Sequence, residues 1–235
     1  MLFSRIGEKM ETVYSTFEKA EGILRNEEKD IIRLIFTRHG RTHLNAKKIF
    51  QPWTPEGDQL NEEGIVSAKN LGKKLSHIPI RKIYSSDWHR AIHTAQLINE
   101  ERKPPLREIY TSRGLRDFNF GTLCGISVTE ADRSNPELSD IRMNRLHIFE
   151  APGGDIFTDF HNTKKEELTE IIKSSSMGNI LIVSHSDVTK CLIMAALDLP
   201  LEIYSNKINI KNTSISIVEL RDRKVPGRLL LLNNR

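Results

Sequence analysis

The sequence has few cysteines and no long apolar run, and these two absences remove several classes of protein. Cys124 and Cys191 are the two cysteines among 235 residues, and two thiols alone build neither a disulfide framework nor a four-ligand zinc site. The longest apolar stretch, Cys191–Leu197, falls far short of the ~20 residues that a membrane span needs. The first residues show no secretory signal pattern. We therefore expect a cytoplasmic protein without a membrane segment.

Aromatic residues are also scarce, at 6% of the chain, and no Gly-x4-Gly-Lys-Ser/Thr phosphate loop occurs, which argues against a nucleotide-driven motor or kinase of that type. The net charge is only +4. Basic spots such as Lys47-Lys48 have no aromatic stacking platform beside them, so we expect no nucleic-acid partner. A mild positive excess suits a small anionic substrate.

The chain divides into an N-terminal amphipathic helical extension, 1–29, and one main domain, 30–235. Apolar residues at 3- and 4-residue spacings predict one helix within the extension. These residues are Met10, Val13, Tyr14, Phe17, Ala20 and Leu24. We expect this helix to dock on the main domain; a dimer contact or a lid over a site are the alternatives.

Strands and helices alternate along the main domain. Short β-branched runs predict strands near 31–37, 82–85, 108–111, 180–183, 215–220 and 228–232. Amphipathic or capped stretches predict helices near 62–76, 87–101, 136–148, 155–175 and 187–197. This alternation predicts an α/β fold with helices on both faces of the sheet.

Two histidines directly follow the two most apolar strands. The first strand runs into Arg38-His39-Gly40, and the strand at 180–183 runs into Ser184-His185. Ligands of open α/β sheets gather at the carboxyl ends of the strands, so the histidines would lie side by side if the strands are neighbours. An arginine offers a planar set of donors for phosphate oxygens, and a neutral imidazole is a competent nucleophile near pH 7.

Two further segments could complete a phosphate pocket. Ser86 or Asp87 is a plausible N-cap for the helix at 87–101, which would place Arg90 in its first turn, pointing back towards the strand ends. Asp117 lies in a loop that ends in a glycine, and a carboxylic acid is the proton donor that a leaving alkoxide needs.

Taken together, these segments resemble the histidine phosphatase superfamily, also called the phosphoglycerate mutase-like superfamily. The resemblance runs from about Leu34 to Leu199. It rests on six segments in order: Arg38-His39-Gly40 with Thr42 and Asn45; Leu60-Asn61-Glu62-Glu63-Gly64 with Ala68; Ser85-Ser86-Asp87 through Arg90-Ala91 and Thr94; Leu115-Arg116-Asp117 through Phe120-Gly121; Pro152-Gly153-Gly154; and Val183-Ser184-His185.

The resemblance implies a three-layer α/β/α sandwich with a mostly parallel central sheet, and a histidine phosphatase domain at 30–235. His39 would be the nucleophile that becomes phosphorylated, and Arg38 and Arg90 would bind the phosphoryl group. His185 would donate to the phosphoryl oxygens as a cation, and Asn45 would lie at the pocket edge. No metal or organic cofactor is implied; His89 and His93 have metal-ligand spacing, but no third ligand is identifiable.

The proton donor is open at this point. Asp117 stands where smaller members of the family usually carry a glutamate, which is one methylene longer. Asp187, two residues after His185, and Asp155, after Pro152-Gly153-Gly154, are competing acids. We favour Asp117.

The predicted function is hydrolysis of phosphomonoesters through a phosphohistidine on His39, because the compact segment between Asp117 and His185 resembles the phosphatases rather than the mutases of the family. A weak or inactive relative that binds a phosphorylated ligand or protein is one alternative, and a phosphoglycerate mutase is another. The expected partner is a small phosphorylated substrate or inorganic phosphate, with no nucleic acid and no membrane. A homodimer is possible.

Overall fold

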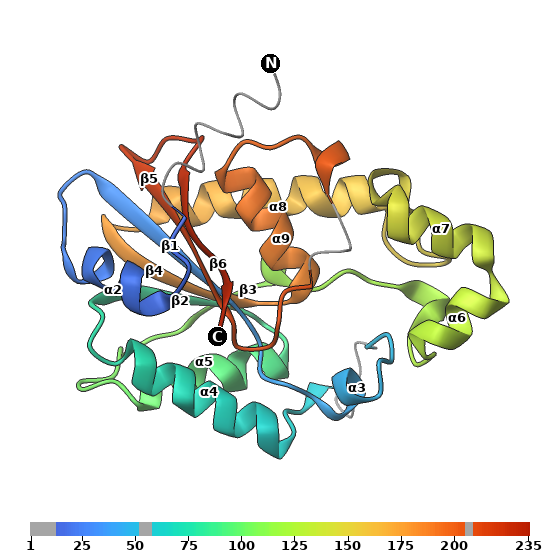
Figure 1. Ribbon diagram of the computed structural model, residues 1–235, viewed down its shortest axis with the longest axis horizontal. Coiled ribbons are helices and arrows are strands. Elements are labelled where there is room, and N and C mark those ends of the chain that lie inside the picture. The colour runs from blue at the N-terminus through green and yellow to red at the C-terminus, as the bar shows by residue number, and fades with distance from the viewer. Residues whose placement is uncertain (1–12, 52–57, 205–208) are drawn as a thin grey trace.

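The computed structural model describes residues 13–51, 58–204 and 209–235, and it contains one six-stranded sheet (Figure 1). The strand order is β3-β2-β4-β1-β5-β6; β3, β2, β4 and β1 are parallel, and β5 runs antiparallel to both of its neighbours, β1 and β6. The strands are β1 (Ile31–Arg38), β2 (Ile80–Ser86), β3 (Tyr110–Ser112), β4 (Gly178–Ser184), β5 (Ile215–Arg221) and β6 (Arg228–Asn234). All six predicted strands are present.

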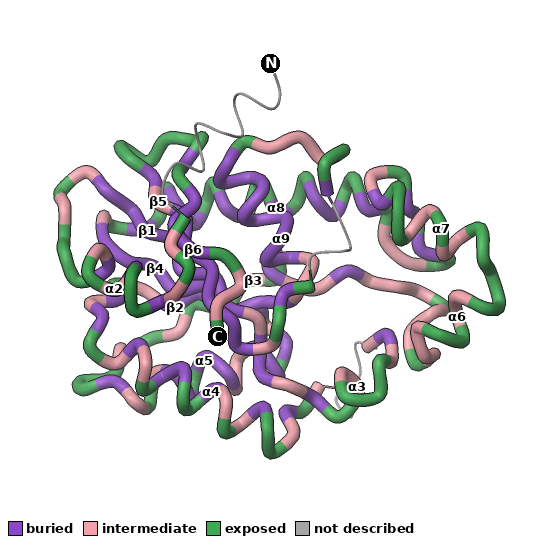
Figure 2. Tube along the Cα trace, in the orientation of Figure 1, coloured by how far each residue is buried: buried purple, intermediate pink, exposed green. Residues whose placement is uncertain are grey.

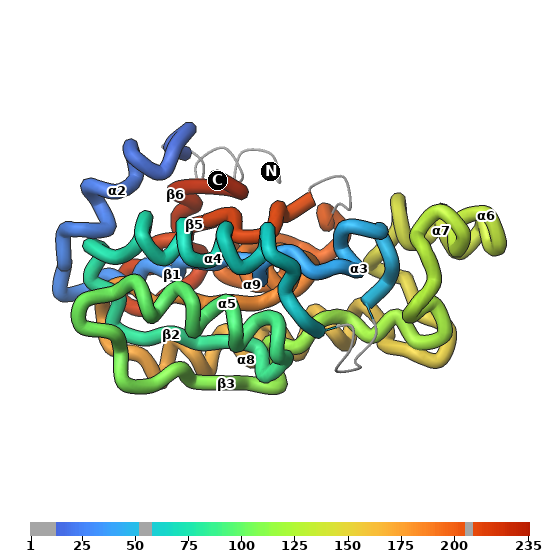
Figure 3. The backbone as a smooth tube through the Cα atoms, turned by 90° about the horizontal axis from the view of Figure 1, so that it is seen from below, coloured from blue at the N-terminus to red at the C-terminus, as the bar shows by residue number. Residues whose placement is uncertain are grey.

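The helices are α2 (Phe17–Arg25), α3 (His43–Ala46), α4 (Glu62–Leu75), α5 (His89–Glu100), α6 (Val128–Ser134), α7 (Pro136–Asn144), α8 (Phe157–Ser174) and α9 (Ser186–Ala196). Short 3-10 turns are η2 (Arg113–Leu115), η3 (Gly121–Leu123), η4 (Leu146–Ile148) and η5 (Leu201–Ile203). The predicted helix at 136–148 ends early at Asn144, and α3 and α6 were not predicted. Helices α6 and α7 project from one end of the molecule (Figures 1 and 3).

Helices cover both faces of the sheet, which confirms the predicted three-layer α/β fold. Successive side chains of a strand point to opposite faces. On β1, Leu34 and Phe36 pack with α8 and α9, whereas Ile35 packs with α4 and α5. Both β1 and β4 are buried along almost their whole length (Figure 2), so their continuous apolar runs report burial on both faces.

Helix α2 docks on the antiparallel edge of the sheet. Phe17, Ala20 and Leu24 are fully buried in the same cluster as β5 and β6. The backbone N–H of Tyr14 donates to the carbonyl of Leu230 at 2.7 Å. Met10, the first residue of the predicted stripe, lies outside the described residues, as does most of 1–16. Within the described ranges, no helix is long and apolar enough to cross a membrane.

Candidate active site

The carboxyl ends of β1 and β4 bring His39 and His185 side by side. The two strands are parallel neighbours in which Arg38 pairs with Ser184, and the backbone N–H of His39 donates to the carbonyl of Ser184 at 2.8 Å. The ring centroids lie 5.2 Å apart, and both side chains are buried. The separation of the rings is therefore set by the spacing of two hydrogen-bonded strands.

Gly40 is required here by packing of the backbone. A Cβ atom at this position would lie 2.7 Å from the carbonyl oxygen of Gly64, at the start of α4. The N–H of Gly40 donates to the hydroxyl of Thr94 on α5 at 2.9 Å. The glycine at this position therefore lets the chain pass against α4.

The hydrogen bonds of His39 fix its tautomer. Nδ1 lies 2.7 Å from the carbonyl oxygen of Gly40, and a carbonyl can only accept, so Nδ1 carries the proton. Nε2 then keeps its lone pair and accepts from Nε of Arg90 at 3.3 Å. Burial, together with the positive charges of Arg90 and Arg38, holds the pKa of His39 well below its ordinary value. His39 is thus a neutral imidazole whose free nitrogen faces an arginine.

Arg90 is fully buried and held by Asp58, a residue that the sequence analysis did not find. Nη1 of Arg90 donates to Oδ1 of Asp58 at 2.7 Å, and the backbone N–H groups of His89 and Arg90 also donate to this carboxylate. The prediction that Ser86 or Asp87 caps the helix is wrong: α5 begins at His89 with Trp88 as N-cap. Asp58 satisfies the first helical donors from another segment.

Arg38 reaches the site from the end of β1. Its Nη1 donates to the carbonyl of Ile210 at 2.8 Å, and its Nε is buried without a hydrogen-bond partner among the described residues. Burial is the main cause that lowers the pKa of Arg38. The buried Arg90 and the half-buried Arg38 together supply two guanidinium groups around His39.

Asn45 has a positioning role at the edge of the site. Its Oδ1 accepts from the backbone N–H of Thr42 in a capping box that starts α3. The same oxygen accepts from Nδ2 of Asn212 at 3.3 Å. Asn212, which precedes β5, also donates to the carbonyl of His39 at 2.8 Å. Asn212 was not predicted, because only the fold brings residue 212 beside residue 39.

His185 contacts Ser86 and Trp88 in a buried environment. Its Nε2 lies 2.9 Å from the hydroxyl of Ser86, and its ring packs edge-on against Trp88. Burial and the charges of Arg90 and Arg38 lower the pKa of His185 well below its ordinary value. This pKa favours the neutral ring; the cationic His185 that we expected concerns a site with a bound phosphoryl group and stays a prediction.

Asp117 is the carboxylate that lies close to both Arg90 and His185. Its Oδ2 lies 3.5 Å from Nη2 of Arg90 and 3.7 Å from Nδ1 of His185, and the side chain is 21% exposed. Burial raises the pKa of Asp117 to about 6; the charge of Arg90 opposes this shift and that of Asp187 adds to it. A carboxyl group with this pKa exists in both protonation states near neutrality.

The competing acids are engaged elsewhere. Oδ1 of Asp187 accepts from the hydroxyl of Tyr204 at 2.8 Å and pairs with Nζ of Lys190 at 2.9 Å. Although burial opposes them, these contacts lower the pKa of Asp187. Asp155 accepts from the backbone N–H of Asn119 at 2.9 Å and so holds the loop that follows Asp117.

A metal site is not apparent in the described part of the chain, where no group of three or more His, Cys, Asp and Glu side chains is arranged to hold an ion. His89 and His93 are neighbours on α5 with ring centroids 5.5 Å apart. The expectation of a metal-free reaction stays a prediction.

Two hollows flank this cluster. One, of about 510 Å³, borders Asp117 and carries mixed charge: Arg113, Arg116 and Lys164 with Asp117, Asp155 and Asp159. The other, of about 630 Å³, borders Arg38 and Asn45 and is strongly basic. Either is large enough to hold a small organic group.

The mostly parallel sheet thus carries Arg38, His39 and His185 at the carboxyl ends of β1 and β4, with Arg90 beside them in the first turn of α5. The family model of the histidine phosphatase superfamily (branch 1) matches residues 34–235. The chain belongs to this superfamily.

Named relatives agree with this membership. The chain is 29% identical over 204 residues to a broad-specificity phosphatase of Saccharomyces cerevisiae, covering 85% of this chain and 84% of the relative. It is 28% identical over 200 residues to a metal-independent phosphoserine phosphatase of Arabidopsis thaliana, covering 84% and 80%. Phosphoglycerate mutases are also among the relatives. The solved structure of Bacillus stearothermophilus YhfR matches with a TM-score of 0.77 at 27% identity, covering 87% of this chain and 98% of that one.

Proposed function

We propose that this protein hydrolyses phosphomonoesters through a phosphohistidine on His39, without a metal ion or an organic cofactor. The observation that carries the proposal is the state of His39. Its Nδ1–H donates to the carbonyl of Gly40, its pKa is well below the ordinary value, and its unprotonated Nε2 faces Arg90. A neutral, oriented imidazole beside two guanidinium groups is suited to attack a phosphoryl group.

The first step transfers the phosphoryl group to His39. The lone pair of Nε2 forms a bond to phosphorus while the ester P–O bond breaks, and Arg38 and Arg90 stabilise the charge on the phosphoryl oxygens. The proton of Asp117 goes to the departing alkoxide oxygen. The contacts of Asp117 with Arg90 and His185, and its raised pKa, support this role.

The second step releases phosphate. Water attacks phosphorus, the bond between phosphorus and Nε2 breaks, and the electron pair returns to His39. The carboxylate of Asp117 takes the proton of the attacking water. A phosphoryl dianion in the pocket favours protonation of His185, so the neutral ring of the structure becomes a donor to the phosphoryl oxygens when substrate binds.

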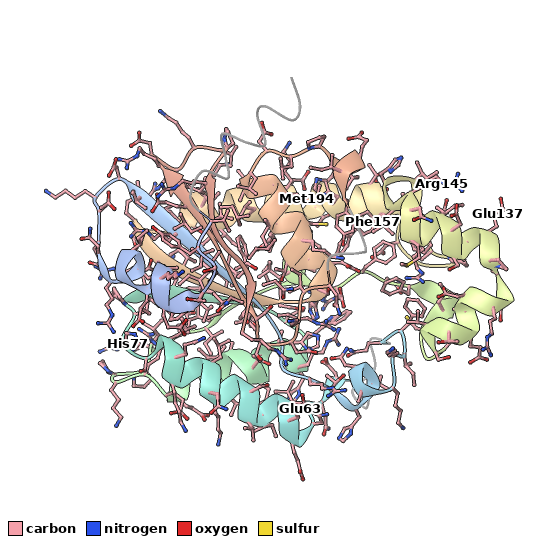
Figure 4. The ribbon with its side chains drawn as sticks, viewed as in Figure 1. Glu63, His77, Glu137, Arg145, Phe157 and Met194 are labelled. Carbon is pink, nitrogen blue, oxygen red and sulfur yellow. The ribbon has the colours of Figure 1, made fainter. Side chains whose placement is uncertain are left out.

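The experiment is a screen of phosphomonoesters with the wild type and His39→Ala. We expect turnover by the wild type, in the presence of a chelator as well as without it, and none by His39→Ala. His77→Ala is the matched control. His77 is exposed and follows the C-terminal end of α4, whereas Glu63 stands at the start of that helix, near Arg41 (Figure 4). The phosphoenzyme should be trapped in alkali, since phosphohistidine is acid-labile.

Other results would favour the other functions. Tight phosphate binding without turnover would indicate a binding protein, and exchange of the phosphoryl group between positions of a phosphoglycerate would indicate a mutase. Loss of activity with the chelator would contradict the metal-free reaction. The cytoplasmic location, the homodimer and the division at residue 29 stay predictions.

A further inference from the structure

The mechanism proposed above assigns no role to the basic hollow beside Arg38. Five cationic residues line it: Arg38, Arg41, Lys48, Lys211 and Arg235. Glu63 is the one acidic side chain among the described residues that line it, and this group is already paired with Nη1 of Arg41. Since the whole chain has a net charge of only +4, this hollow concentrates positive charge.

The hollow is built by ordered contacts between distant segments. The N–H of Lys211 donates to Oδ1 of Asn233 at 2.9 Å, and Nε of Arg235 donates to the carbonyl of Asn212 at 3.3 Å. The carbonyl of Lys48 accepts from the N–H of Val128 at 2.9 Å. These contacts hold the backbones of Lys211 and Lys48 and the side chain of Arg235.

Arg38 belongs to both the hollow and the phosphoryl site. It lies one residue before His39, and Asn212, which lines the hollow, donates to the carbonyl of His39. The buried Nε of Arg38 has no hydrogen-bond partner in the described part of the chain. A ligand that spans from the phosphoryl site into the hollow would therefore pass along Arg38.

We propose that this hollow is a subsite for a second anionic group, a phosphate or a carboxylate, carried by the substrate of the proposed phosphatase. This inference rests on the proposed function. The hollow on the Asp117 side carries as many carboxylates as cations, so it does not select for negative charge. Lys48 and Lys211 form no ion pair with any described residue, so they remain available to an anion.

A small ligand fits these features better than a nucleic acid. The hollow has about 630 Å³, which is in the range of small-molecule sites. None of its described lining residues is aromatic, whereas single-stranded nucleic acids are usually bound on aromatic stacking surfaces.

The experiment compares the binding of alkanediol monophosphates and α,ω-alkanediol bisphosphates of several chain lengths. Calorimetry is done on His39→Ala, so that neither ligand is consumed and the result does not depend on turnover. We expect one bisphosphate length to bind at least about tenfold more tightly than its monophosphate, which corresponds to about 1.4 kcal/mol.

The variant that tests the site is Lys48→Ala/Lys211→Ala in the same background. It should lose the preference for the bisphosphate and keep the affinity for the monophosphate. Lys165→Ala/Lys173→Ala is the charge-matched control, because both lysines are exposed on α8 outside the hollow; it should keep the preference.

Three results would overturn the subsite: equal affinity at every length, a preference that survives Lys48→Ala/Lys211→Ala, or an equal loss in the control pair. Failure of the proposed function is distinguishable from these. In that case the wild type would hydrolyse neither ligand, while the calorimetric comparison would still decide the subsite.

Discussion

The pKa of Asp117 gives the sharpest test of the proposed chemistry. Asp117 donates a proton only in its acid form, and burial raises its pKa to about 6. The protonated fraction therefore falls as pH rises through about 6, to about one in a hundred at pH 8. The pKa of His39 is lowered well below its ordinary value by burial and by Arg90, which favours its neutral form over the same range.

The perturbation is Asp117→Asn, and the assay is kcat/KM between pH 5 and 9 for an alkyl phosphate and for 4-nitrophenyl phosphate. General acid catalysis contributes about 10²- to 10⁴-fold, so the ratio of wild type to variant on the alkyl ester should lie in this range below pH 6. Above it, the ratio should fall about tenfold per pH unit. Nitrophenolate leaves without a proton, so its ratio should stay near unity.

The ratio of wild type to Asp117→Asn cancels the effect of ionisation of the substrate phosphate on kcat/KM, because this effect is the same for both enzymes. Asp187→Asn is the control, and it should preserve the dependence of the rate on the leaving group. The fall of kcat/KM for the alkyl ester should move to lower pH in this variant, because the charge of Asp187 helps to raise the pKa of Asp117. A ratio for Asp117→Asn that does not change with pH, or equal losses on the two esters, would refute the role of Asp117.

Three further predictions concern binding and stability. Asp58→Ala should raise KM about ten- to a hundredfold and change kcat less, because a charged hydrogen bond to Arg90 is worth about 1.5–3 kcal/mol; an unchanged KM in steady-state kinetics would contradict this. Asp117→Asn should increase the free energy of unfolding in urea by up to about 3 kcal/mol at pH 8, since the folded state raises the pKa of Asp117 and loses stability as pH rises from about 4 to about 6, and the gain should vanish at pH 3. Leu24→Ala should lower the free energy of unfolding by about 2–5 kcal/mol if α2 is part of the folded unit, whereas the exposed Val66→Ala should change it little; equal effects would show that α2 does not contribute.

The elements that could be predicted from the sequence are those with a local signal. The apolar runs of β1 and β4 predict buried strands. His39 and His185 follow these runs directly, so the sequence places both histidines at strand ends. Because parallel strands end at the same edge of a sheet, the meeting of His39 and His185 followed from one further assumption, that the strands are neighbours.

The parts of the site that the sequence analysis missed act through space. Asp58 caps α5 from a different segment, and Asn212 reaches His39 from the segment before β5. Neither has a distinctive neighbour in the sequence. The protonation states were also not accessible: the shifts of His185 and Asp117 come from burial and from Arg90, whose side-chain position only the fold fixes.

The hydrogen bond from His39 to the carbonyl of Ser184 has a consequence for how this kind of protein can diversify. This bond, made by the backbone N–H of His39, ties that residue to the centre of the sheet, where a shift of one strand by a single residue would turn its side chains to the opposite face. The two hollows, by contrast, are bordered mainly by loop residues, together with α8 in one case and with helix ends and the C-terminal residue in the other. Under the proposed function, new preferences for the alcohol portion of the substrate would then arise from changes at these borders, without a change in the residues that act at phosphorus.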